Sequence, residues 1–164
     1  MAMTMTGQVA LPADRATVWA ALNDAAILKS AIPGCQELDK VSDSEFTATA
    51  KVAVGPVKAT FKGKVNLTDI DAPNGYTISG EGQGGVAGFA KGGAKVRLAD
   101  GEGGGTELSY DVEAHVGGKL AQLGGRLING VAKKYADEFF TNFAKALAPA
   151  EAGPPKAEHV VSDA

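Results

Sequence analysis

The sequence predicts an α+β domain in which a curved antiparallel sheet is covered by one long helix. Over residues 36–116, hydrophobic side chains recur at a period of two between clusters of Gly, Pro, Asn and Asp. This pattern is typical of antiparallel strands joined by turns. Residues 119–147 change to a period near that of an amphipathic helix. With 164 residues, 45% of them hydrophobic, the chain suits one domain with a substantial core.

The N-terminal segment is expected to form one strand and then two short helices. Residues 3–11 alternate weakly and stop before Pro12, which cannot donate a hydrogen bond to a sheet. Asp14 is a typical helix N-cap and precedes an apolar stripe. That stripe consists of Val18, Trp19 and Leu22. A second short helix is expected over residues 25–32, ending at Pro33-Gly34.

The strands alternate between an apolar face and a polar face, as residues 57–67 show most clearly. Many residues of the apolar face are small. They are Ala48, Ala50, Ala59, Gly63, Gly80, Gly82 and Ala94. Because protein interiors are close-packed, either the sheet and the helix approach each other tightly or a guest molecule fills the space. The second alternative predicts an elongated apolar cavity for a lipid-like ligand.

The wall of such a cavity is expected to combine strand and helix residues. The candidates on the strands are Phe46, Phe61, Val65, Tyr76, Gly80, Gly82 and Tyr110, and those on the helix are Leu123, Gly124 and Leu127. The polar groups among them are the two tyrosines. We interpret both as core aromatics with satisfied hydroxyls rather than as acid catalysts.

The glycine-rich stretch over residues 80–93 matches G-x-G-x-x-G, but its context argues against a dinucleotide site. That motif requires a helix N-terminus after the glycines, whereas residues 94–98 alternate as a strand. A phosphate-binding P-loop is excluded because no Gly-Lys-Ser/Thr follows. Residues 85–93 instead predict a hairpin at the cavity mouth, with Phe89 at its centre. Phe89 would close the pocket, enter a bilayer or dock on a partner.

Neither a catalytic nor a metal site is expected, and nucleic acid is not an expected partner. The strand acids and His115 fall on the outward face, and His159 lies in the tail without a scaffold. Cys35 is the single cysteine, which rules out an internal disulfide and a cysteine-rich zinc site; we interpret it as a structural thiol. A formal net charge of −3 disfavours nucleic acid.

A cluster of cations on the outward face forms a predicted basic patch. Its members are Lys51, Lys58, Lys62 and Lys64. Such a patch is either a solvated sheet edge or a surface that docks on an anionic membrane or an acidic protein.

The ends of the chain bear on domain limits and location. Residues 149–164 are rich in Pro, Ala and charge without periodicity, which predicts a disordered tail after a domain over residues 1–148. The first residues lack the pattern of a signal peptide, and no apolar run is long enough to span a bilayer. We therefore expect a cytoplasmic protein whose membrane association is peripheral.

Several segments together resemble the carbon monoxide dehydrogenase G-subunit family of the START-like (SRPBCC, helix-grip) superfamily. The similarity covers about residues 3–148. Residues 11–24 (LPADRATVWAALND) are generic to the superfamily. The other matching segments are 32–36 (IPGCQ), 54–57 (VGPV), 61–65 (FKGKV), 80–84 (GEGQG) with Gly88-Phe89, and 117–127 (GGKLAQLGGRL). The glycine-rich segment and the last segment are together the specific ones.

This resemblance implies a seven-stranded sheet gripping the C-terminal helix, with an apolar cavity between them. It also implies a non-enzymatic accessory protein that recruits a carbon monoxide dehydrogenase-type molybdenum hydroxylase to the inner face of the cytoplasmic membrane. No covalent cofactor is expected; the expected ligand is a membrane quinone or another isoprenoid or acyl lipid. Two alternatives stay open: a START-like cyclase or hydrolase acting on a hydrophobic substrate, and a hydroxylase maturation factor that binds no lipid.

Overall fold

The structure is a computed structural model that describes residues 1–147 and 156–163. Its first half contains β1 (Ala2–Leu11), α1 (Arg15–Leu22), α2 (Ala25–Ala31), β2 (Cys35–Ser42), β3 (Glu45–Val54), β4 (Val57–Asp71) and β5 (Gly75–Gln83). Its second half contains η1 (Gly85–Ala87), β6 (Phe89–Asp100), η2 (Glu102–Gly104), β7 (Thr106–Gly117), α3 (Lys119–Gln122), α4 (Gly125–Leu147) and β8 (Lys156–Asp163).

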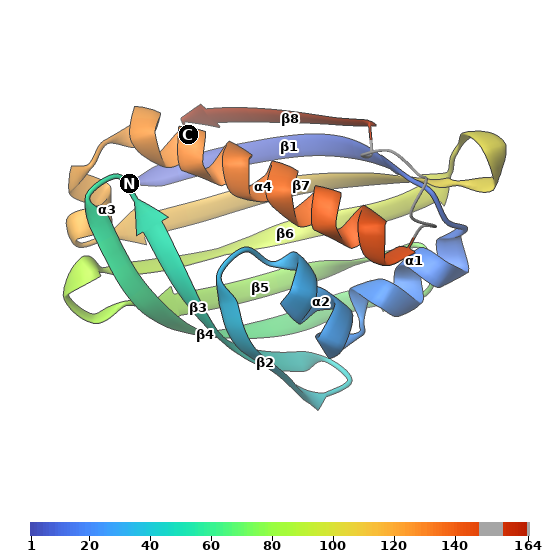
Figure 1. Ribbon diagram of the computed structural model, residues 1–164, viewed down its shortest axis with the longest axis horizontal. Helices are drawn as coiled ribbons and strands as arrows, with labels where there is room; N and C mark the ends of the chain where they lie inside the picture. The colour runs from blue at the N-terminus through green and yellow to red at the C-terminus, as the bar shows by residue number, and fades with distance from the viewer. Residues whose placement is uncertain (148–155, 164) are drawn as a thin grey trace.

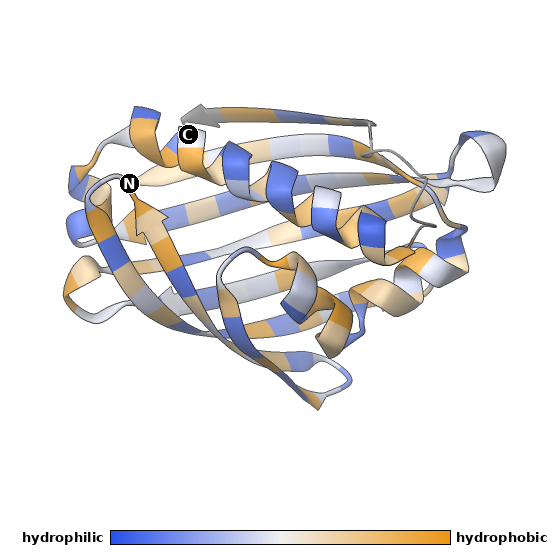
Figure 2. Ribbon diagram, viewed as in Figure 1, coloured by the Kyte–Doolittle hydropathy of each residue, from blue (hydrophilic) through white to orange (hydrophobic). Residues whose placement is uncertain are grey.

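The strands form a single antiparallel sheet in the order β2-β3-β4-β5-β6-β7-β1-β8. The long helix α4 crosses one face of this curved sheet, while α1 and α2 lie beside its C-terminal half (Figure 1). Apolar and polar residues alternate along the strands (Figure 2). Because successive side chains of a strand point to opposite faces, the apolar residues gather on the face under α4, where they form the core. The predicted α+β helix-grip class is therefore confirmed.

The hydrophobic core has two parts, one at each end of α4. The larger part lies under α1, α2 and the C-terminal half of α4, where Val18 and Phe143 are fully buried. The smaller part gathers around Leu120 of α3 and Ile128 near the start of α4.

Both short N-terminal helices begin at aspartate caps. The Asp14 carboxylate accepts a hydrogen bond from Thr17 N at 2.8 Å, as the sequence predicts. The Asp24 carboxylate does the same for α2, accepting from Ala26 N at 2.9 Å. These caps fix where the two helices leave the sheet.

The predicted continuous helix over residues 119–147 is wrong at its beginning. It is split into α3 and α4 by Leu123 and Gly124, and Gly124 has a φ of +87°. Such a conformation favours glycine and ends a helical segment. The uninterrupted apolar stripe in the sequence concealed this break.

The C-terminal segment corrects a second prediction. The composition of residues 149–164 predicts disorder, whereas residues 156–163 form β8 and pair with the free edge of β1. The sheet therefore has eight strands instead of seven. Alternation over His159 to Ser162 is too short to stand out beside the preceding prolines. The predicted domain end at residue 148, and residues 149–155 and 164 of the predicted tail, lie outside the described residues.

Candidate functional site: an apolar cavity under the long helix

A cavity of about 500 Å³ lies between the inward face of the sheet and α4, with α1 and α2 contributing at one end. Its wall is built mainly from apolar side chains of seven strands, β1 to β7, the two short helices and α4. Tyr76, Tyr110 and Tyr135 are the residues on this wall that carry a polar side-chain group; no charged side chain of the described residues lines it. A site of this kind binds uncharged, largely apolar molecules, because a charge placed there would have no partner.

Four of the sequence-predicted residues lie on the cavity wall. They are Phe46, Val65, Tyr76 and Tyr110. The α4 residues on the wall, among them Ala132, Tyr135, Ala136 and Phe139, were missed. The predicted helix residues were chosen from the first turns of the helical segment, whereas the helix contributes to the wall only from Ala132 onward.

The three predicted helix residues lie away from the cavity. Gly124 is exposed, and a Cβ atom built there would meet no other atom within 4 Å. Leu127 packs on the turn at Gly55, where a Cβ would lie 2.8 Å from Leu127 Cδ2. Leu123 packs against the smaller core cluster. The break between α3 and α4 redirects all three.

The remaining predicted strand residues also lie outside the cavity wall. Phe61 belongs to the smaller core cluster, and its ring occupies the space over Gly84. Gly80 and Gly82 lie in a shallower depression of about 330 Å³, which shares Val65, Ile78, Ala94 and Val112 with the cavity. These two glycines therefore border the site without lining it.

Phe89 does not stand at the cavity mouth. It begins β6 on the outward face, where its ring covers Gly117, and it is 38% exposed. The exposed apolar tip of this hairpin is instead Val86 in η1, at 84% exposure. The structure thus removes the predicted lid but leaves an apolar surface at this end of the molecule.

The hydroxyls of the three cavity tyrosines have different surroundings. The Tyr135 hydroxyl accepts a hydrogen bond from Ala53 N of β3 at 3.2 Å. The Tyr110 hydroxyl shares a hydrogen bond with Nδ1 of His159. The Tyr76 side chain is buried, and its hydroxyl forms no hydrogen bond with a described residue. The prediction of a satisfied hydroxyl is therefore confirmed for Tyr110, while no described residue supplies a partner for Tyr76.

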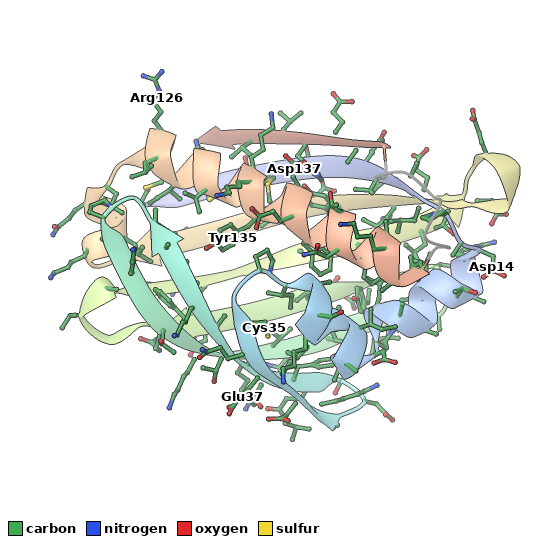
Figure 3. The ribbon with its side chains drawn as sticks, viewed as in Figure 1. Asp14, Cys35, Glu37, Arg126, Tyr135 and Asp137 are labelled. Atoms are coloured by element: carbon green, nitrogen blue, oxygen red, sulfur yellow. The ribbon has the colours of Figure 1, made fainter. Side chains whose placement is uncertain are left out.

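His159 was expected to lack a scaffold, yet its side chain is buried beneath α4. Its ring stacks on Phe140, with centroids 5.7 Å apart. Its Nε2 lies 3.2 Å from Asp137 Oδ1 without meeting hydrogen-bond geometry, and this contact becomes an ion pair only when the imidazole is protonated. Figure 3 shows Asp137 and Tyr135 on α4, and their contacts place them toward β8 and β3 respectively. The sequence gives no local signal for this cluster, because its members come from three distant segments.

Burial sets the protonation of this cluster. It raises the pKa of Tyr110 to about 12, with the negative charge of Asp137 acting in the same direction. Burial also lowers the pKa of His159. The negative charge of Asp137 acts to raise this pKa, and the positive charge of Lys133 acts to lower it further. At neutral pH the pair is therefore a neutral tyrosine and a neutral imidazole.

Cys35 is half-buried at the start of β2. Its thiol donates a weak hydrogen bond to Glu37 O at 3.4 Å, and burial raises its pKa. This environment suits a structural thiol, since a nucleophilic cysteine needs a lowered pKa. Within residues 1–147 and 156–163 no three His, Cys, Asp or Glu side chains are grouped to hold a metal ion.

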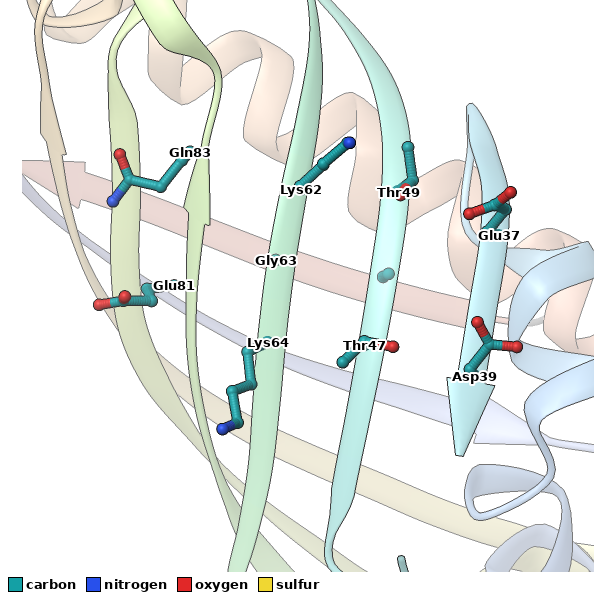
Figure 4. A pocket seen from close by; sticks show the side chains of 10 residues that line it. Glu37, Asp39, Thr47, Thr49, Lys62, Gly63, Lys64, Glu81 and Gln83 are labelled. Atoms are coloured by element: carbon teal, nitrogen blue, oxygen red, sulfur yellow. The ribbon is translucent and has the colours of Figure 1, made fainter. Parts of the chain in front are cut away.

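The predicted basic patch lies on the outward face of β3 and β4, where all four lysines are exposed. Lys64 forms an ion pair with Glu45 at 2.6 Å, and Lys62 and Lys64 border a polar depression that also contains Glu37, Asp39 and Glu81 (Figure 4). The cationic surface is therefore concentrated at Lys51, Lys58 and Lys62, which form no ion pair with any described residue.

The family model described as the carbon monoxide dehydrogenase G-subunit (CoxG) matches residues 7–148. The chain belongs to the CoxG family. Its match runs from within β1 past the end of α4, and it includes every residue on the cavity wall except Met5. A search of curated proteins found no match.

Solved structures agree with this assignment. A conserved protein from Geobacillus kaustophilus is 29% identical, with a TM-score of 0.85, and the match covers 95% of this chain and 98% of that one. A START superfamily protein from Mycobacterium smegmatis is 12% identical, with a TM-score of 0.67 and coverage of 88% and 97%. The ZhuI aromatase/cyclase from Streptomyces sp. R1128 is 11% identical, with a TM-score of 0.65 and coverage of 90% and 94%. The last two similarities show that this CoxG chain has the START-like fold.

In the part of this CoxG chain that the structure describes, no helix is long and apolar enough to cross a membrane.

Proposed function

We propose that this CoxG-family protein is a non-enzymatic accessory protein that carries a membrane quinone in its apolar cavity. In this proposal it recruits a carbon monoxide dehydrogenase-type molybdenum hydroxylase to the inner face of the cytoplasmic membrane. The bound quinone would then be the electron acceptor that the protein presents to the enzyme, since electrons from such an enzyme must reach the respiratory chain.

The observation that carries the proposal is the cavity itself. Its volume of about 500 Å³ falls within the ~300–1,000 Å³ range of small-molecule sites. Its wall is apolar apart from three tyrosine hydroxyls. An uncharged head group with an isoprenoid chain matches this chemistry, whereas an ionised ligand does not.

The proposed membrane contact is the end of the molecule that carries the β3–β4 hairpin, η1 and the α3–α4 connection. Exposed apolar side chains occur there, including Val86, Phe89 and Leu127. Lys51 and Lys58 lie on the hairpin at the same end. Apolar side chains beside cations suit an anionic bilayer surface, to which each cation adds about 1 kcal/mol of attraction.

A cyclase or hydrolase would need two polar side chains converging in the cavity. The hydroxyls of Tyr110 and Tyr135 are already bonded to His159 and to the backbone at Ala53, respectively. This arrangement supports the accessory role over the enzymatic alternative, to which the ZhuI fold similarity would otherwise point.

Lipid analysis tests the ligand. The purified protein is extracted with organic solvent, and the extract is examined by mass spectrometry; the protein is then incubated with menaquinone and with ubiquinone. We expect a co-purifying quinone or saturable uptake of an added one. Finding no lipid and no uptake of either quinone would rule the proposal out.

Co-sedimentation tests recruitment. The large subunit of the hydroxylase is mixed with this protein in the presence and absence of anionic liposomes. We expect the hydroxylase to sediment with liposomes when this protein is present. Binding to the hydroxylase without any liposome association would instead favour the maturation factor that binds no lipid.

A further inference from the structure

Tyr76 is the cavity tyrosine whose hydroxyl lacks a partner among the described residues. It starts β5 and lies opposite Val96 of β6, near the end of the cavity formed by α1. Its ring packs against Trp19 of α1, with centroids 5.2 Å apart. No described residue forms a hydrogen bond with its hydroxyl.

Tyr76 lines the cavity, so its hydroxyl is left to pair with water or with a ligand held there. Once an apolar ligand displaces that water, an unpaired hydroxyl costs about 1–3 kcal/mol. A phenylalanine would fill the same space without this cost. The hydroxyl at Tyr76 therefore points to a partner that the described protein residues do not supply.

The chemistry of that partner follows from the surroundings. Burial raises the pKa of Tyr76, so its hydroxyl stays protonated and can donate a hydrogen bond. No cation of the described residues lines the cavity to balance an anionic ligand. An uncharged oxygen acceptor, such as a carbonyl, satisfies both conditions.

We propose that the Tyr76 hydroxyl donates a hydrogen bond to a carbonyl oxygen of the bound ligand, which places the ligand's polar group at the α1 end of the cavity. The apolar chain then extends along the sheet toward Tyr135, whose hydroxyl is already held by Ala53 N of β3. This inference rests on the proposed ligand-binding function, because it specifies how the same cavity recognises its ligand.

The test compares two probes of equal chain length, a long-chain methyl ketone and the corresponding alkane. Trp19 is the single tryptophan of the chain and contacts Tyr76, so its fluorescence reports binding at this end of the cavity. We expect Tyr76→Phe to bind the ketone about threefold to tenfold more weakly than the wild type, the usual effect of losing one hydrogen bond. Binding of the alkane should be unchanged.

Ser30→Ala is the control, because it removes a hydroxyl that lies outside the cavity and donates to Ile27 O. Both probes should bind this variant as they bind the wild type. Ligand-free Tyr76→Phe should melt no lower than the wild type, because it loses no hydrogen bond to a described residue. If Tyr76→Phe binds the ketone as tightly as the wild type does, this inference is wrong and the cavity function stands. If the wild type binds neither probe, the ligand-binding function fails, and this inference fails with it.

Discussion

Gly7 of β1 lies directly beneath the ring of Tyr110, between the strand that carries Tyr110 and the strand that carries His159. A Cβ atom at Gly7 would lie 2.5 Å from Tyr110 Cζ and 2.6 Å from its hydroxyl oxygen. Real Cβ atoms do not approach other atoms so closely. The missing side chain at this position is what allows Tyr110 to reach across β1 and bond to His159.

Gly7→Ala should therefore destabilise the protein by about 1–3 kcal/mol, the usual cost of overpacking a core. Urea unfolding followed by circular dichroism measures this change. Gly130→Ala is the matched control: Gly130 is exposed in α4 with no atom within 4 Å of a built Cβ, so alanine should stabilise the helix by up to about 1 kcal/mol. Equal effects of the two substitutions would contradict this role of Gly7.

Gly124 is the residue at which the structure most changes an expectation. On the sequence alone, Gly124→Leu would fill the cavity and block uptake of a ligand. Because Gly124 is exposed at a φ of +87°, the leucine should instead cost about 1–2 kcal/mol of backbone strain and leave uptake unchanged. Unfolding in urea and quinone uptake are measured on the same sample. A loss of uptake without loss of stability would mean that Gly124 does face the ligand.

Among the elements, β8 is held in place by its pairing with β1, by the buried side chain of His159 and by Val161, which packs against the smaller core cluster. Ala157, Glu158 and Val160, which flank His159, are exposed. The charged groups facing its imidazole are Asp137 and Lys133, both on α4. The docking of β8 should therefore depend on the protonation state of this histidine.

The direction of this dependence follows from the lowered pKa of docked His159. A released β8 would have a histidine of ordinary pKa near 6.5, so it binds more protons than the docked strand below that pH. Docking is fully stable above about pH 6.5 and weakens as the pH falls from 6.5 toward the lowered value. Hydrogen exchange of the β8 amides, corrected for intrinsic rates, should lose protection over this range.

His159→Gln serves as the control for this prediction. Glutamine can still bond to the Tyr110 hydroxyl but does not titrate, so protection of β8 should become independent of pH in this range. If the variant retains the same pH dependence as the wild type, another group controls the docking of β8. The amides of β5, at the centre of the sheet, provide an internal reference.

At the scale of the whole molecule, the sequence predicts what local periodicity encodes. The strand alternation around Phe46 and Val65 correctly placed these residues on the inner face, and the Asp14 cap located α1. The sequence could not locate what depends on distant contacts: the break at Gly124 lies inside a regular apolar stripe, and the burial of His159 depends on a strand pairing made about 150 residues away in the chain. Gly80 and Gly82 lie on the predicted inner face of the sheet but beyond the end of the cavity. Periodicity predicts which face a residue is on, and it does not predict where along the strand a cavity ends.

The proposed function depends on the space between α4 and the sheet, which a larger side chain on α4 can occupy. Ala136 lies on the cavity wall, whereas Ala146 of the same helix is exposed. Ala136→Trp should reduce quinone uptake at least tenfold without lowering the melting temperature, because the cavity of about 500 Å³ can accept the indole. Ala146→Trp should leave uptake unchanged. If Ala136→Trp keeps the native circular dichroism spectrum and takes up quinone normally, the quinone binds elsewhere on the protein. Liposome binding is measured for both variants, and it shows whether membrane contact is independent of the cavity.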